Sequence, residues 1–164
     1  MAVAIALVLV VAALLGIVLH RLSAQNDRQH AAATAAYLGG PAAQAAEASA
    51  SREATATLTY NYKTLAANFA TAEAGMTPSF RASYLKSTET LVTPTAPKTQ
   101  ADSTAAVTAG GVSQASATTA TVLLFVDQTV TNNLLAHPRL DRSRIEVSMV
   151  KVNGKWLINN LVPL

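Results

Sequence analysis

Residues that could carry catalysis are few in this 164-residue chain, and the sequence does not group them into a recognisable motif. None of the three histidines, His20, His30 and His137, has a second histidine or a carboxylate beside it in a metal-binding pattern. The chain has no cysteine, which excludes disulfides, thiolate metal sites and a cysteine nucleophile. It also has no phosphate-binding glycine loop and no G-x-S-x-G motif. We therefore expect no catalytic residues, no metal and no cofactor.

Asp127 is the only acid placed for general acid–base chemistry, since it lies in the most apolar segment after the N-terminal region, 120–131. A buried carboxylate that faces hydroxyl donors can exchange protons near neutral pH. The candidate donors are three tyrosines, Tyr60, Tyr62 and Tyr84. The alternative is that Asp127 and Gln128 point outward where this segment leaves the core. We favour the outward orientation, because burying an unpaired carboxylate is costly. The protein is therefore predicted not to be an enzyme.

A second group of charged side chains lies at the end of a predicted loop, 132–140. Its members are Arg139, Asp141, Arg142 and Arg144. One interpretation is a solvated loop with local ion pairs, each of which contributes little to stability. The other is a docking edge for an acidic partner or for lipid headgroups. The whole chain has a net charge of +3 and only 13% charged residues. That is too sparse for the clustered basic surface of a nucleic-acid-binding protein.

The longest apolar segment, 1–19, contains no charged and no strongly polar residue. As an α-helix it would extend about 28 Å, close to the hydrocarbon thickness of a bilayer. A cleaved signal peptide is the alternative, but its best cleavage site has Leu22 where a small residue is required. We therefore predict a single-pass transmembrane anchor over 1–22. Arg21 and Arg28 both follow the apolar segment, and the positive-inside rule alone would favour a cytoplasmic domain.

The next segment, 23–57, is rich in alanine and is predicted to be helical. Gly39-Gly40-Pro41 interrupts it, because glycine is costly inside a helix and proline lacks a backbone donor. Residues 42–57 carry almost no large apolar side chain that could be buried. We therefore interpret 23–57 as a stalk, which joins the anchor to a domain over 58–164.

Two or three helices are predicted at the start of that domain. Apolar residues recur every three or four positions over 58–76, which indicates one face of a helix. The β-prone residues 59–62 divide this stripe at a corner, and Gly75 is a stop signal. Thr77-Pro78 predicts the N-cap and first residue of a further helix that ends before Pro94.

Beyond residue 98 the hydrophobic period changes to two, which predicts four antiparallel strands. Gly110-Gly111 indicates a bulge in the first strand, opposite Leu124-Phe125 of the second strand. Asn153-Gly154 predicts a type I′ turn between strands over 142–152 and 155–161. Counting across that turn places five apolar side chains on one core face: Ile145, Val147, Met149, Trp156 and Ile158.

Helices followed by an antiparallel meander define an α+β fold. The predicted architecture is an N-terminal transmembrane helix and a helical stalk, followed by a cone-like domain. Two or three helices and a curled four-stranded antiparallel sheet form this domain, which has one open mouth.

Four short segments of the chain form a recognisable set. In chain order they are Thr59-Tyr60-Asn61-Tyr62-Lys63-Thr64-Leu65, Phe125-Val126-Asp127-Gln128-Thr129, Asp141-Arg142-Ser143-Arg144 and Gly154-Lys155-Trp156-Leu157. With these segments the chain resembles the Mce-associated membrane proteins of actinobacteria. The resemblance covers about 58–164 and the single anchor, while Gly39-Gly40-Pro41 departs from the family's continuous stalk. It implies a cone domain similar to nuclear transport factor 2, held outside the cytoplasm by a single pass through the cytoplasmic membrane.

The resemblance also implies a function, an accessory or stabilising subunit of a mammalian-cell-entry type lipid and sterol import complex. The expected partners are the other importer subunits in the mycobacterial envelope, with a homo-oligomer as a further option. No nucleic-acid partner is expected. Two alternatives stay open. One is an assembly subunit of a secretion or conjugation channel, and the other is a small-ligand-binding or enzymatic cone.

Overall fold

The structure is a computed structural model that describes residues 39–164. Its elements in order are α2 (Pro41–Leu58), α3 (Leu65–Glu73), α4 (Pro78–Ser87), the π-helical turn η1 (Thr88–Val92), α5 (Ala96–Thr99), β1 (Asp102–Ala115), β2 (Thr119–Thr131), β3 (Arg139–Val152) and β4 (Lys155–Pro163). The predicted anchor over 1–22 and the first part of the stalk lie outside the described residues. Within those residues, no helix is long and apolar enough to cross a membrane.

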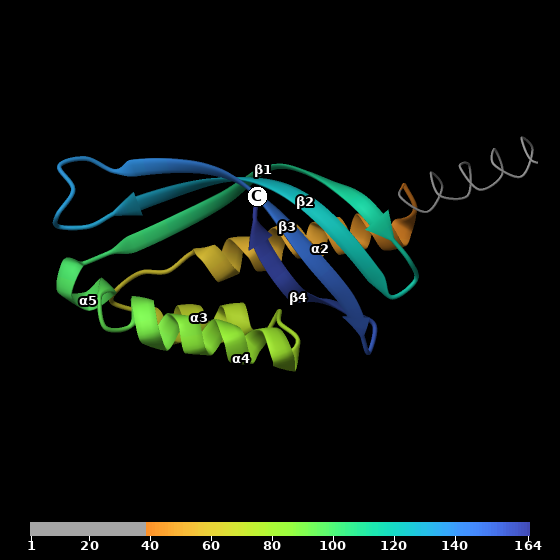
Figure 1. Cartoon of the computed structure of the whole chain (residues 1–164), viewed down its shortest axis with the longest axis horizontal. Coiled ribbons are helices and arrows are strands. Elements are labelled where there is room, and N and C mark those ends of the chain that lie inside the picture. The colour runs from red at the N-terminus through yellow and green to blue at the C-terminus, as the bar shows by residue number, and fades with distance from the viewer. Residues whose placement is uncertain (1–38) are drawn as a thin grey trace, which may run out of the picture. The chain divides into compact units, whose positions relative to one another are not determined.

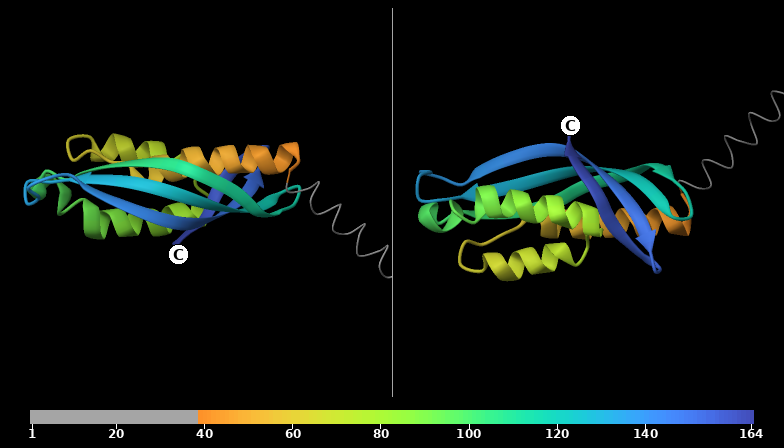
Figure 2. Two further views of the ribbon diagram at one scale, coloured as in Figure 1. Left: turned by 90° about the horizontal axis from the view of Figure 1, so that it is seen from above. Right: turned by 60° about the horizontal axis from the view of Figure 1, so that its bottom comes forward.

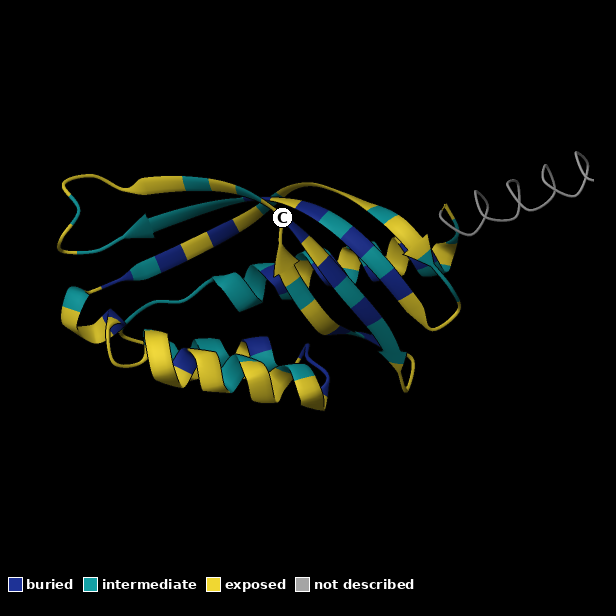
Figure 3. Ribbon diagram, viewed as in Figure 1, coloured by how far each residue is buried: buried dark blue, intermediate teal, exposed yellow. Residues whose placement is uncertain are grey.

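The four strands form one antiparallel meander in the order β1-β2-β3-β4, as predicted. The sheet curls, and α2, α3 and α4 gather on one side of it (Figures 1 and 2). Buried and exposed positions alternate along the central strands (Figure 3), so each strand has an inner and an outer set of side chains. The inner set meets the helices and forms the core. The α+β prediction is confirmed for the described part of the chain.

Helix α2 lies along the inner face of the sheet and belongs to the core. Four alanines on one side of it, Ala43, Ala46, Ala50 and Ala54, are fully buried. Their spacing of three and four residues forms a narrow stripe, and their small size lets the helix backbone approach the strands closely. The predicted stalk over 23–57 therefore contains, from Pro41 on, the longest helix of the domain. The large side chains of this interface come from the strands.

Gly110 of β1 is one of the positions that this close approach requires. A Cβ added there would lie 2.7 Å from Leu124 Cδ2 and 3.3 Å from Glu47 Oε1 of α2. Gly110 pairs with Leu124 and Gly111 with Leu123. This is one residue away from the prediction, in which Phe125 faces Gly110 and Leu124 faces Gly111. The irregularities of β1 fall on either side of the glycines, at residues 108 and 113. Gly110 is therefore a site of close contact between two bulges, whereas a Cβ added at Gly111 would meet nothing within 4 Å.

The β3–β4 hairpin confirms the predicted register. Met149 pairs with Ile158, and Lys151 pairs with Trp156. The turn residues have the positive φ angles that a type I′ turn requires, 49° at Asn153 and 82° at Gly154. All five side chains assigned to the core face are buried.

In the helical part, the predicted cap of α4 is confirmed, whereas the lengths of the helices differ from the prediction. Thr77 caps α4, because the backbone N–H of Phe80 donates to Thr77 Oγ1 at 3.4 Å. The stripe over 58–76 is broken at the expected corner, where Tyr60 forms an isolated bridge with Ser103. The short helix α5 around Pro97 was expected only as a stiff link.

Candidate functional site

The predicted docking edge lies in the first part of β3, where Arg142 and Arg144 are on the outer face and Arg139 and Asp141 are at positions that alternate with them. Arg139 and Asp141 form a local ion pair, in which Nη2 and Nε lie 2.7 and 2.9 Å from Asp141 Oδ2. Their side chains are 61% and 46% exposed, so solvent screens this pair and it contributes little to stability. Arg142 and Arg144 follow at alternate positions, and both are exposed on the outer side of β3.

Asp127 lies beside this edge. Its β-ladder partner is Arg142, and Arg142 Nε lies 3.7 Å from Asp127 Oδ1. Val126 on one side of Asp127 is buried, whereas the Asp127 side chain is 33% exposed on the outer face. The favoured orientation of Asp127 therefore agrees with the structure. Among the described residues, no ion pair is formed by Arg144.

Large apolar side chains are exposed between these charges. Phe125 is 43% exposed and pairs with Arg144, and Val162 is 41% exposed and pairs with Glu146. Leu140 is 49% exposed at the start of the same strand as the arginines. We call this surface the outer-face patch, formed by Phe125, Leu140, Arg142, Arg144 and Val162. Exposed apolar groups rimmed by charge are typical of protein-interaction surfaces.

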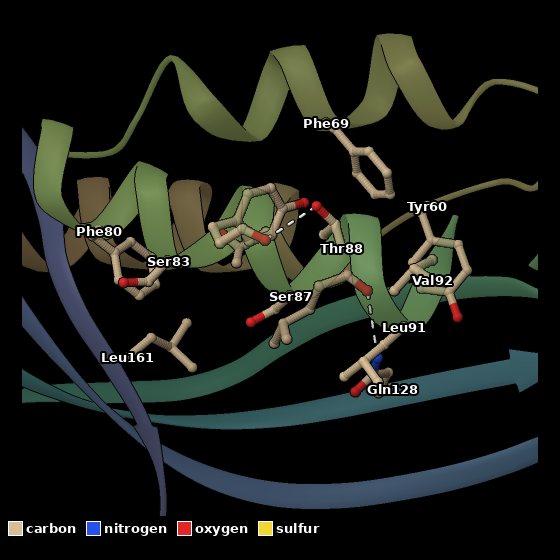
Figure 4. Close-up of a pocket in the computed structure, with 13 residues that line it drawn as sticks. Tyr60, Phe69, Phe80, Ser83, Ser87, Thr88, Leu91, Val92, Gln128 and Leu161 are labelled. Atoms are coloured by element: carbon tan, nitrogen blue, oxygen red, sulfur yellow. Dashed lines mark hydrogen bonds between the residues drawn. The ribbon is translucent and has the colours of Figure 1, made fainter. Parts of the chain in front are cut away.

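The inner side of the sheet contains a cavity of about 330 Å³ between α4, η1 and the strands (Figure 4). Its lining residues are Thr57, Leu58, Tyr60, Phe69, Phe80, Ser83, Tyr84, Ser87, Thr88, Leu91, Val92, Gln128 and Leu161. None of these lining residues is an Asp, Glu, His, Lys or Arg. Tyr60 and Tyr84 line the cavity, whereas Tyr62 and Asp127 do not.

The Gln128 side chain points inward and lines this cavity. This corrects the expectation that it points outward with Asp127. Its Nε2 donates to Ser103 Oγ at 2.7 Å and to the Leu58 carbonyl at 3.4 Å. An amide at this position cannot exchange protons as a carboxylate would. The acid–base hypothesis required a carboxylate beside the tyrosines, and the cavity that Tyr60 and Tyr84 line has none among its lining residues.

The two cavity tyrosines stay protonated at neutral pH. Burial raises the pKa of Tyr84 to about 12, with a further contribution from the charge of Glu73. Burial also raises the pKa of Tyr60, and the charge of Asp102 adds to the shift. Within the described residues, no cluster of three or more His, Cys, Asp or Glu could hold a metal ion.

Trp156 is a core residue, as expected, but with a feature that the sequence does not show. It is 6% exposed, and its buried indole N–H has no acceptor among the described residues. The Lys151 ammonium lies 5.7 Å from the centre of the indole ring and forms a cation–π interaction with it.

The fold resembles that of solved domains that include a type IV secretion system protein. An IcmL-like type IV secretion system protein of Legionella pneumophila superposes with a TM-score of 0.65 at 14% identity, over 77% of this chain and 96% of that one. The periplasmic domain of DotI gives 0.63 at 14% identity, over 74% and 94%. VirB8 of Agrobacterium tumefaciens gives 0.57 at 13% identity, over 71% and 88%. The TM-scores show a common fold, and at identities this low the likeness shows the fold alone.

Sequence relatives place the chain more narrowly. It is 34% identical to the outer membrane protein Rv1973 of Mycobacterium tuberculosis over 110 residues, 67% of this chain and 68% of that protein. The chain belongs to the family of this mycobacterial protein. It is also 37% identical over 123 residues to the uncharacterized protein Rv1362c of the same organism, 75% of this chain but only 56% of that relative. The chain thus spans little more than half the length of Rv1362c. No family model matches the chain.

Proposed function

We propose that this protein is a non-catalytic accessory subunit that holds together a multiprotein complex in the cell envelope. In this proposal the domain over 41–164 lies outside the cytoplasmic membrane, on the predicted single-pass anchor. The observation that carries it is the outer-face patch, where Phe125, Leu140 and Val162 are exposed around Arg142 and Arg144. Arginine and large apolar side chains are enriched at the centres of protein interfaces.

The complex that the fold favours is a secretion or conjugation channel, with this chain as an assembly subunit. The supporting observation is the likeness to the domains of DotI, VirB8 and the IcmL-like protein, which are components of such systems. A subunit of this kind binds neighbours and needs no turnover.

A second candidate is an accessory subunit of a mammalian-cell-entry type lipid importer. Its support is the resemblance to Mce-associated proteins, together with relatives from Mycobacterium tuberculosis. Two of the four motifs meet in space, because Phe125 pairs with Arg144 and Asp127 pairs with Arg142. Two of the segments that carry the resemblance thus meet at the outer-face patch, as expected if the family uses this surface.

Site-specific photo-crosslinking in native membranes tests the proposal. A benzophenone amino acid is introduced at Phe125 of the full chain, and the captured proteins are identified by mass spectrometry. The matched control is the same amino acid at Leu134, which is 78% exposed in the β2–β3 loop. We expect a discrete adduct from position 125 that position 134 does not give. Channel components in the adduct favour the first candidate, and importer subunits favour the second. Equal capture at both positions would refute a docking function for the patch.

A further inference from the structure

The cavity beneath α4 and η1 is unlike a packing defect, because large side chains line it and its entrance lies at the surface. Phe69 and Tyr84 stack edge to face, with ring centroids 6.0 Å apart and an interplanar angle of 89°. Together with Phe80 and Leu161 they form an apolar wall. Ser83, Ser87 and Leu91 line the cavity and are also exposed, Leu91 to 65%. These three residues therefore form its mouth.

The size of the cavity sets the size of a ligand. Small-molecule sites occupy about 300–1,000 Å³, and this cavity, at about 330 Å³, lies at the lower limit of that range. A site of this size holds a small ligand, such as one medium-length alkyl or isoprenoid chain.

The chemistry of the walls sets the charge of a ligand. A charged group inside the cavity would lose its hydration without gaining an ionic partner, since no lining residue is ionised at neutral pH. The polar side chains are largely engaged within the protein. Gln128 Nε2 binds Ser103 and Leu58, and Thr88 Oγ1 donates to the carbonyls of Tyr84 and Leu85, each at 3.0 Å.

The helix at the mouth is irregular. Residues Thr88–Val92 form a π-helical turn directly after α4, and such turns occur frequently at functional sites. Here the turn supplies Thr88, Leu91 and Val92 to the lining. We propose that the cavity binds one uncharged alkyl or isoprenoid chain, which enters between Ser83, Ser87 and Leu91. This goes beyond the proposed function, which requires no ligand.

The chain could belong to a free neutral molecule or to a membrane lipid, and photolabelling of the full-length protein in nanodiscs distinguishes the two. One arm uses dodecan-1-ol with a mid-chain diazirine, and the other uses phosphatidylcholine with a diazirine in one acyl chain. Labelled peptides are located by mass spectrometry. We expect saturable labelling of peptides over 80–92, competed by unlabelled dodecan-1-ol. Labelling in the first arm alone identifies a free molecule, and labelling in the second identifies a lipid chain.

A plug variant provides the control. Ser87→Phe places an aromatic ring in the mouth, while Ala82→Phe places the same ring at an exposed α4 position outside the lining. We expect Ser87→Phe to reduce labelling about tenfold, the factor for 1.4 kcal/mol, and Ala82→Phe to leave it unchanged. Ser83→Phe serves as a second plug if Ser87→Phe fails to fold, as judged by thermal melting. Equal labelling of plug and control, or labelling that does not saturate in either arm, would overturn the site. Crosslinking from Phe125 is read separately, so failure of the docking function is not confused with failure of the site.

Discussion

The inner and outer faces of the sheet are built from the same strands, yet their side chains have opposite roles. Inward, Val122, Leu124 and Val126 of β2 are at most 1% exposed against the helices. Outward, the alternate residues of the same strand include Phe125 at 43% and the ion-paired Asp127. The inner face is therefore responsible for stability. On the outer face, apolar side chains are exposed to water in the isolated chain, as expected if the proposed partner covers them in the complex.

The largest expected effect lies on the inner face, at Trp156. Trp156→Ala removes the largest side chain of the buried hairpin face, and we expect the free energy of unfolding to fall by about 3–5 kcal/mol. Urea denaturation measures it. Trp156→Phe is the matched control, because it keeps an aromatic ring and removes the unpartnered indole N–H. It should be clearly less harmful, and an alanine variant of normal stability would contradict the core assignment.

The alanine stripe of α2 gives the next largest effect. Ala50 is fully buried against the sheet, so Ala50→Leu should force the helix away and cost about 1–3 kcal/mol. Ala48 is exposed on the same helix, and Ala48→Leu should change stability by less than about 0.5 kcal/mol. If both variants unfold alike, α2 does not pack on the sheet through this stripe.

A pH dependence reports on the cavity side of the inner face. The pKa of Tyr84 is raised to about 12 in the folded state from 10.0, so its ionised form is disfavoured by folding. Its contribution to stability is present below pH 10 and is lost as the pH rises towards 12. The denaturation midpoint should fall in that window, and it should fall less in Tyr84→Phe. Identical pH profiles for the two proteins would show that Tyr84 is not desolvated.

The smallest stability effect is expected on the outer face at Asp127. Its ion pair with Arg142 is 3.7 Å long and exposed, so Asp127→Asn should cost no more than about 1 kcal/mol. Complex formation and envelope lipid uptake should stay close to normal. Loss of uptake in a variant that folds and assembles would indicate a chemical role for this carboxylate.

Local signals allowed part of this arrangement to be predicted from the sequence. The Asn153-Gly154 turn fixes the register of β3 and β4, because a two-residue turn leaves one pairing. The Thr77 cap likewise depends on neighbours in the chain. The inward orientation of Gln128 was missed although its signal was present. Alternation from Val122 through Val126 continues to residue 128.

Other features depend on segments that are far apart in the sequence. The alanines of α2 looked unfit for a core, because the large side chains that bury them, such as Leu124 and Ile158, lie some seventy or more positions later. The cavity depends on how far α4 stays from the strands, which no local pattern records. The outer-face patch was predicted only at its charged edge, since the exposure of Phe125 follows from the parity of β2 and not from its composition.

The central claim, that the outer face docks a partner, is tested most directly by reversing the charge of both exposed arginines of the patch. In Arg142→Glu with Arg144→Glu, the side chains are exposed, so thermal melting should change little. Charge reversal at an interface should abolish partner capture. The measurement is affinity purification of the full chain from gently solubilised membranes, with the melting temperature taken in parallel. We predict a stable protein that no longer retains its partners. A stable variant that retains them undiminished would contradict the account.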